Sequence, residues 1–128
     1  MRRESGGEMS ESQEQQALFQ WAAIAERQYP ELRLLHAIPN SGKRHIITAV
    51  RMKAEGQKAG VSDIFLPVAR HGFHGLYIEL KIKGGRVSPS QADWIKLTTV
   101  QGYKSIVCVG WEDARMEIEG YLTCTKGK

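Results

Sequence analysis

Cysteine and long apolar runs are scarce in this sequence, and each shortage argues against a class of protein. Only two cysteines occur, Cys108 within the apolar run SIVCVG and Cys124 near the C-terminus, which gives no sign of a disulfide framework or a zinc cluster. No run approaches the roughly 18 apolar residues of a membrane-spanning helix. The N-terminal arginines are not followed by the apolar segment of a secretory signal. We therefore expect a soluble cytoplasmic protein, in a reducing compartment, that does not bind membranes.

The sequence also has no large excess of positive or negative charge. The 128 residues include 18 Lys and Arg against 14 Asp and Glu, a net charge of +4. This mild excess permits nucleic acid or another phosphate-bearing partner, but a basic and unspecialised surface would give the same number. With 41% hydrophobic and 25% charged residues, the composition fits one globular domain with a single core.

The hydrophobic pattern predicts helices that alternate with strands. Signals for helix ends are Ser10 as an N-cap, Pro30 as a stop, Gly56 as a C-cap, and a capping box from Ser88 to Gln91. This alternation predicts an α/β fold with a mixed sheet of about four strands flanked by helices. The predicted helices cover residues 10–30, 45–56, 88–102 and 111–122, and the predicted strands cover 32–38, 63–68, 75–83 and 103–110.

Three charged residues stand out in two adjacent predicted strands. Asp63 opens DIFLPV, while Glu79 and Lys81 interrupt GLYIELKIK. A charge in a packed sheet costs several kcal/mol unless it is paired, solvated or bound to metal. Because alternate residues of a strand share a face, Glu79, Lys81 and Lys83 lie on one side. One interpretation is therefore a solvated strand face with a salt bridge from Glu79 to Lys81.

The second interpretation is a metal site. Asp63 and Glu79 are 16 residues apart, so they meet at one edge if their strands pair. Two nearby carboxylates resist joint ionisation, a divalent cation removes that conflict, and hard oxygen ligands select Mg²⁺ or Mn²⁺. Lys81 can then orient water or stabilise charge that develops on a phosphate. Such a set suits metal-assisted phosphodiester hydrolysis, although the pattern alone has many chance matches.

The segments around these residues make the pattern more specific. With them the sequence resembles the VRR-NUC family, the virus-type replication-repair nucleases of the PD-(D/E)xK superfamily, which implies a restriction-endonuclease-like core. Ser62 stands where the family often has proline, a departure that is compatible with a turn into a strand. We expect the nuclease domain over residues 10–122, between a disordered lead over 1–9 and a flexible tail over 123–128. The resemblance rests on IPNSGKR (38–44), KAEGQKAGVSDIFLPV (53–68), GLYIELKIKGGRVSPSQADW (75–94) and GYKSIVCVGWEDARMEIEGYL (102–122).

The resemblance implies roles for individual residues. Asp63 and Glu79 match the metal ligands, joined by the backbone carbonyl of Leu80, and Lys81 matches the catalytic lysine. Gln91 matches a glutamine near the active site. We expect the capping-box role of Gln91 to compete with a role in the site, because one amide cannot serve both fully.

A glutamate on the first helix usually completes the site in this family. Glu11 and Glu14 are both candidates, and Glu11 is preferred. Both acids would also favour the positive end of the helix dipole without any role in a site. His71 and His74, three apart in a glycine-rich turn, lack a third ligand and give only a weak zinc signal. Residues suited to contact phosphates, or equally to an ordinary surface, are Asn40, Lys43, Arg44, Lys53, Lys58 and Lys83.

Two functions fit the sequence. The first is a Mg²⁺- or Mn²⁺-dependent endodeoxyribonuclease, and the alternative is a catalytically silent nucleic-acid-binding module of the same fold. The intact acids and lysine favour the nuclease. A chain this small leaves no room for a separate DNA-reading domain, so we expect recognition of shape or backbone. Resemblance to stand-alone family members implies a homodimer that acts on branched DNA such as a Holliday junction, and suggests phage or prophage origin by analogy.

Overall fold

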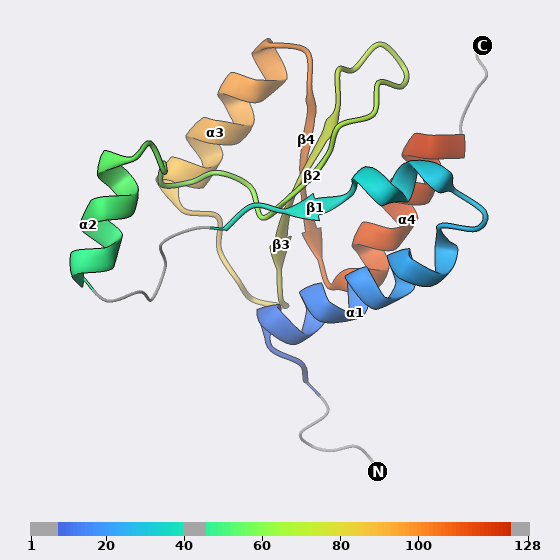
Figure 1. The fold of residues 1–128 in the computed structure, drawn as a ribbon, viewed down its shortest axis with the longest axis horizontal. Helices are drawn as coiled ribbons and strands as arrows, with labels where there is room; N and C mark the ends of the chain where they lie inside the picture. Colours follow the sequence, from blue (N-terminus) through green and yellow to red (C-terminus); the bar gives the residue numbers. More distant parts are fainter. Residues whose placement is uncertain (1–7, 40–45, 124–128) are drawn as a thin grey trace.

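Helices flank a small central sheet in this protein. The computed structural model describes residues 8–39 and 46–123 (Figure 1). None of the helices in these two ranges is long and apolar enough to cross a membrane. In chain order the elements are α1 (Glu11–Ala25), the 3₁₀ helix η2 (Pro30–Leu34), β1 (His36–Ala37), α2 (Ile46–Ala54), β2 (Ile64–Leu66), β3 (Leu76–Lys81), α3 (Pro89–Val100), β4 (Lys104–Val109) and α4 (Trp111–Thr123).

The sheet is mixed and has the strand order β1-β2-β3-β4. The first three strands are antiparallel to one another, whereas β3 and β4 run parallel and are joined through α3. Helices α1 and α4 pack together on one face, and α3 lies on the other (Figure 1). This arrangement confirms the predicted α/β class with its four-stranded mixed sheet flanked by helices.

The hydrophobic core lies between the sheet and the α1–α4 pair. Leu76, Ile78 and Leu80 alternate along β3, and all three are buried. They belong to the same buried cluster as Leu18 of α1 and Ile118 of α4. Burial of one large aliphatic side chain stabilises a fold by about 1.5–3 kcal/mol, so this face fixes the position of β3 firmly. The alternate side chains of β3 must then point toward α3.

Three of the four predicted helix signals are confirmed, whereas Pro30 does not end the first helix: α1 stops at Ala25, and Pro30 begins η2. Ser10 begins α1 with a capping box to Gln13, and Ser88 begins α3 with a capping box to Gln91. Gly56 follows α2 with a φ of +108°, the left-handed conformation that favours glycine after a helix. Each N-terminal cap of this kind is worth about 1 kcal/mol. Local sequence therefore determines where α1 and α3 begin and where α2 ends.

The strand predicted over residues 32–38 is wrong for most of its length. Pro30–Leu34 forms a 3₁₀ helix, and only His36–Ala37 pairs with β2. Leu32 and Leu35 are both buried, and their spacing of three places them on one side of a 3₁₀ turn. Proline suits the first turn of such a helix because it has no N–H to leave unpaired.

The apolar run of residues 106–109 predicts a buried strand, and this prediction is wrong for most of β4. The strand lies at the edge of the sheet, with Val107 38% and Val109 53% exposed. Only Cys108 is fully buried, on the core side. Asp113 accepts a hydrogen bond from the Val109 N–H at 3.0 Å, which occupies a backbone donor near the end of the strand. A side chain that occupies a backbone donor in this way limits the pairing of an exposed edge strand with a strand of another molecule.

The loop before β2 packs against the start of α3. Gly60 has a φ of +87°, and a Cβ at this position would lie 2.4 Å from the backbone oxygen of Ser90. Only glycine permits both the conformation and the close approach. The contact holds the segment that leads to Asp63 against the end of α3 that carries Gln91.

Candidate active site

Polar side chains collect on the face of β3 that points toward α3. Tyr77, Glu79 and Lys81 occupy this face, since they alternate with the core residues of the strand. From α3, the Nε2 of Gln91 donates to Glu79 Oε2 at 2.8 Å. The rings of Tyr77 and Trp94 meet edge to face, with centroids 5.6 Å apart. The candidate site therefore lies between β3 and the first turns of α3.

Glu79 and Lys81 are buried rather than solvated. Glu79 is 2% and Lys81 8% exposed, and the Lys81 Nζ lies 3.5 Å from Glu79 Oε2. The predicted pairing of the two side chains is present, but the interpretation as a solvated strand face is wrong. A buried ion pair rarely stabilises a fold more than apolar side chains of the same size would. Its presence in this sheet calls for a reason other than stability.

Asp63 reaches the same place from the neighbouring strand. Ile64 of β2 is opposite Ile78 of β3, so the antiparallel register places Asp63 opposite Glu79. The Asp63 Oδ2 accepts a hydrogen bond from the Leu80 N–H at 2.8 Å. The pairing of strands on which the metal-site interpretation depended is therefore present, and it brings the two carboxylates together.

One oxygen of Glu79 lacks a partner. Oε2 accepts from Gln91 and faces Lys81, whereas Oε1 is buried and has no hydrogen-bond partner within the described ranges. A buried polar atom without a partner costs about 1–3 kcal/mol. An oxygen-preferring divalent cation held between Glu79 and Asp63 would satisfy this atom. The residues present therefore fit such a cation.

The carboxylates available for that cation are few. Among residues 8–39 and 46–123, no group of three His, Cys, Asp or Glu side chains could hold a metal ion together. Mg²⁺ is commonly bound by one or two carboxylates, with water completing its octahedral shell. Asp63 and Glu79 thus match the number of carboxylates that Mg²⁺ or Mn²⁺ commonly takes. Water or substrate oxygens would have to supply the remaining ligands.

The surroundings of Glu79 favour its protonated form. Burial, and then the negative charge of Asp63, raise the pKa of Glu79 from its ordinary value of 4.5 to about 7, although Lys81 acts in the opposite direction. A divalent cation at the pair would lower this pKa, because it favours the ionised carboxylate.

The raised pKa predicts how the stability of the metal-free protein depends on pH. Between pH 4.5 and about 7, native Glu79 keeps a proton that the unfolded chain releases, so the free energy of unfolding should fall as pH rises. One pKa unit corresponds to about 1.4 kcal/mol, so the part of this loss that falls between pH 5 and pH 8 is roughly 2–3 kcal/mol. Urea unfolding in chelator at pH 5 and pH 8 measures it. Glu79→Gln cannot ionise and should lack this component. If Glu79→Gln and the unaltered protein showed the same pH dependence, Glu79 would not be the group responsible for it.

Gln91 serves the capping box and the site at once, so the expected competition is not found. Its Oε1 accepts from the Ser88 N–H at 2.9 Å, while its Nε2 donates to Glu79 at 2.8 Å. An amide has separate acceptor and donor ends, and each end here has its own partner. Gln91, in the first turn of α3, thereby fixes the orientation of the Glu79 carboxylate.

The two glutamates of α1 lie in different surroundings. The Glu14 Oε1 accepts from the Trp111 N–H at 2.8 Å, which joins α1 to the first residue of α4. Glu14 also lines a cavity beside Lys83, just beyond the end of β3. Glu11 is exposed, and within the described ranges its side chain makes no hydrogen bond. The choice between the two as the residue that completes the site stays a prediction.

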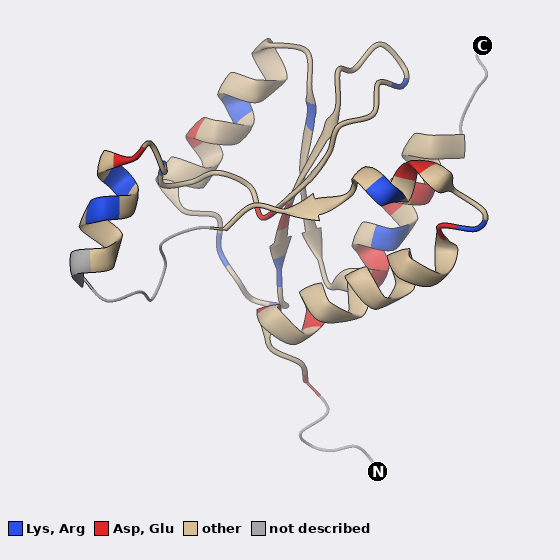
Figure 2. Ribbon diagram, viewed as in Figure 1, with Lys and Arg blue, Asp and Glu red and all other residues tan. Residues whose placement is uncertain are grey.

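Basic residues predicted to contact phosphates lie outside this buried cluster. Lys53 of α2 and Lys58 after it are exposed, and α2 stands apart from the sheet with Lys and Arg along it (Figure 2). Lys83 is exposed two residues beyond Lys81. Asn40, Lys43 and Arg44 lie outside the described residues.

Aromatic residues of the site were not predicted from the sequence. Tyr77 stacks on Phe65 of β2, with centroids 4.3 Å apart, and contacts Trp94 of α3. These rings set the spacing between α3 and the sheet. The spacing in the sequence could have indicated both rings. Tyr77 precedes Glu79 by two residues and so shares its strand face, and Trp94 follows Gln91 by three and so shares its helix face.

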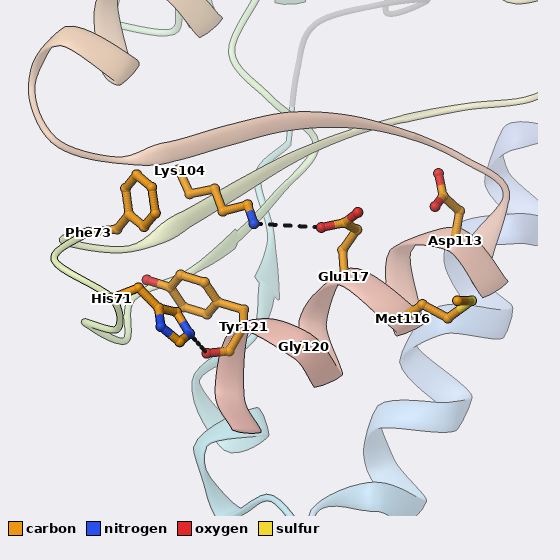
Figure 3. Close-up of a pocket in the computed structure, with 8 residues that line it drawn as sticks. All are labelled: His71, Phe73, Lys104, Asp113, Met116, Glu117, Gly120 and Tyr121. Carbon is orange, nitrogen blue, oxygen red and sulfur yellow. Dashed lines mark hydrogen bonds and ion pairs between the residues drawn. The ribbon is translucent and has the colours of Figure 1, made fainter. Parts of the chain in front are cut away.

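A second cavity, of about 460 Å³, lies on the α4 side of β4 (Figure 3). One of its two acids, Glu117, is paired with Lys104 at 3.7 Å, and none of the predicted nuclease-site residues lines it. The ring of His71 contacts the Tyr121 backbone oxygen there at 2.9 Å, whereas His74 packs on Tyr103. The two histidines thus have separate partners, which gives no support to a zinc site.

Comparisons with known proteins agree with this geometry. A family model for the VRR-NUC domain matches residues 6–112, which include the sheet, α3 and the cluster around Glu79. No curated protein gives a significant match. A solved structure described as "VRR_NUC domain protein" is similar with a TM-score of 0.76 and 27% sequence identity, over 90% of this chain and 89% of that chain. The chain therefore belongs to the VRR-NUC family and has its nuclease-type fold.

Proposed function

We propose that the protein is a Mg²⁺- or Mn²⁺-dependent endonuclease that hydrolyses phosphodiester bonds in branched DNA. One observation carries the proposal: a buried Glu79 oxygen without a partner lies beside Asp63 and an ion-paired Lys81. Stability alone does not account for three charged groups in a packed sheet. Membership of a nuclease family supports the same conclusion.

Asp63 and Glu79, with the backbone carbonyl of Leu80, would hold the cation in this proposal. When bound, the cation supplies Lewis-acid polarisation of the phosphoryl group and lowers the pKa of a water molecule. The protein fixes both carboxylates in advance. The Leu80 N–H holds Asp63 at 2.8 Å, and Gln91 holds Glu79 at the same distance. Groups fixed before the reaction need no reorganisation as charge develops.

Lys81 supplies a positive charge next to the carboxylates. Its Nζ lies 3.5 Å from Glu79, in a site with little access to water. In such surroundings a fixed ammonium stabilises negative charge on a phosphate far better than it would in water. We assign Lys81 to the charge that develops on the reacting phosphate, and we assign the exposed Lys53, Lys58 and Lys83 to phosphates farther along the DNA.

The metal requirement is tested with purified protein and three DNA substrates: a four-way junction, a flap and a linear duplex. We expect branched DNA to be cut in Mg²⁺ or Mn²⁺, no cutting in chelator, and full recovery when the metal is restored, because cation binding relieves the carboxylate pair. Undiminished cleavage in chelator would overturn the mechanism. Binding without cleavage under every metal condition would instead indicate the silent nucleic-acid-binding module.

We further propose that the active form is a homodimer. Two sites related by a twofold axis suit symmetric cuts in a four-way junction, as in Holliday-junction resolvases. Light scattering at micromolar concentration should give a mass near twice the 14.4 kDa of one chain. A monomeric mass in the same solution that cuts a junction fully would contradict this prediction.

A further inference from the structure

A cavity of about 420 Å³ lies at the end of the sheet beside the candidate active site. Its lining residues come from the start of α1 and from the ends of β3 and β4. Figure 1 shows where these elements lie. Its apolar wall comes from Met9, Ile82 and Val109, and charged residues at its margin are Glu8, Glu14 and Lys83.

Residues that line the cavity are neighbours of Lys81 in the chain and in the sheet. Val109 is opposite Lys81 in the parallel register of β3 and β4, so the two side chains share the face that carries Glu79. Ile82 and Lys83 follow Lys81 in the chain. The Gly110 N–H donates to the Lys81 backbone oxygen at 2.8 Å, which holds the lining of the cavity against the end of β3. A group in the cavity would thus lie close to Lys81, which we assign to the reacting phosphate.

The lining does not suit a DNA phosphate. Two of its three charged residues are the acids Glu8 and Glu14, which repel phosphate, and its apolar wall offers phosphate no hydrogen bond. A nucleobase has the complementary chemistry, because it is uncharged, has two apolar faces and carries N–H donors on its edge. Apolar side chains commonly contact the faces of an unstacked base. Carboxylates accept from base-edge donors such as the cytosine amino group.

Lys83 adds a contact for the phosphate of the same nucleotide. It is exposed at the margin of the cavity, where its ammonium can reach the phosphate attached to a bound nucleotide. From these observations, and resting on the proposed nuclease function, we propose that the cavity receives one unpaired nucleobase of the substrate strand, next to the scissile phosphate. Only DNA with an unpaired base at that point, such as a flap or an open branch, can supply it, which gives the site a structural basis for substrate selection.

The test is a binding titration in chelator with flap DNA that carries one abasic residue at successive positions on each side of the branch. We expect one position at which loss of the base weakens binding by about tenfold, the effect of losing one base contact. Val109→Ser should bind the intact flap about tenfold more weakly and should no longer distinguish that position. Met9→Ser should behave similarly. Neither variant should change binding of a linear duplex, which has no base to place in the cavity.

Val107→Ser is the matched control, since Val107 is an exposed valine on the same face of β4 that does not line the cavity. It should keep the full sensitivity to the abasic position. Equal sensitivity in Val109→Ser and the unaltered protein, or no sensitive position at all, would overturn the inference. Because the titration needs no cleavage, absence of nuclease activity in Mg²⁺ would overturn the proposed function and leave this result to be judged separately.

Discussion

Replacing Asp63 or Glu79 by its amide should abolish DNA cleavage while the protein stays folded. Asp63→Asn keeps an oxygen that can accept from the Leu80 N–H, and Glu79→Gln keeps the volume of the side chain. Each change removes one of the two charges that would hold the cation. We expect the single-turnover rate on branched DNA in saturating Mg²⁺ to fall by at least roughly 10²–10³-fold, because both the cation and its polarising effect are lost.

Stability should not decrease in these two variants. Burial, and then repulsion from Asp63, raise the pKa of Glu79 to about 7, so removal of either charge relieves a conflict in the metal-free protein. Urea unfolding at pH 8 in chelator should therefore show an unchanged or higher free energy of unfolding for both. This result would distinguish a functional pair from a structural one, whose loss destabilises the fold.

Asp93→Asn provides the control for both acids. Asp93 is exposed on α3, within two residues of Gln91 but away from the sheet, and the same change of charge there should leave the rate within about twofold. DNA binding by all three variants, measured in chelator, should stay close to that of the unaltered protein. Normal cleavage by Asp63→Asn would show that the ligand assignment is wrong.

Lys81→Met should lower the cleavage rate by roughly 10² or more, with only a small effect on binding. Methionine keeps most of the apolar stem in this buried position and removes the ammonium that lies 3.5 Å from Glu79. Loss of one preorganised charge that acts on the transition state has an effect of this size. The rate is measured in single turnover at saturating enzyme, so that weaker binding cannot imitate slower chemistry.

Lys83→Met is the matched comparison for Lys81. Lys83 is two residues farther along the chain, about 6–7 Å, and its side chain is exposed. It should affect binding, with the slope of log affinity against log salt smaller by about one, while the single-turnover rate is retained. Equal rate losses for the two variants, explained by weaker binding alone, would remove Lys81 from the chemistry.

The sequence by itself determined the starts of α1 and α3, the end of α2, the α/β class and the identity of the charged cluster. Ser10, Ser88 and Gly56 act within a few residues of their own position, so their effects can be predicted without knowledge of the rest of the chain. The acid before one strand and the Glu-x-Lys within the next were conspicuous because charges are costly in strands that pack.

Only the tertiary structure decided which of these residues meet and how deeply they are buried. The register of β2 against β3 places Asp63 opposite Glu79, and the packing of the fold buries Lys81, which strand periodicity alone left on a solvated face. The same packing leaves the apolar strand β4 at an edge and turns residues 30–34 into a 3₁₀ helix. Whether a residue is buried depends on which elements pack against its own in the folded protein. The hydrophobicity of a segment indicates only that it needs some packing partner, and not which one.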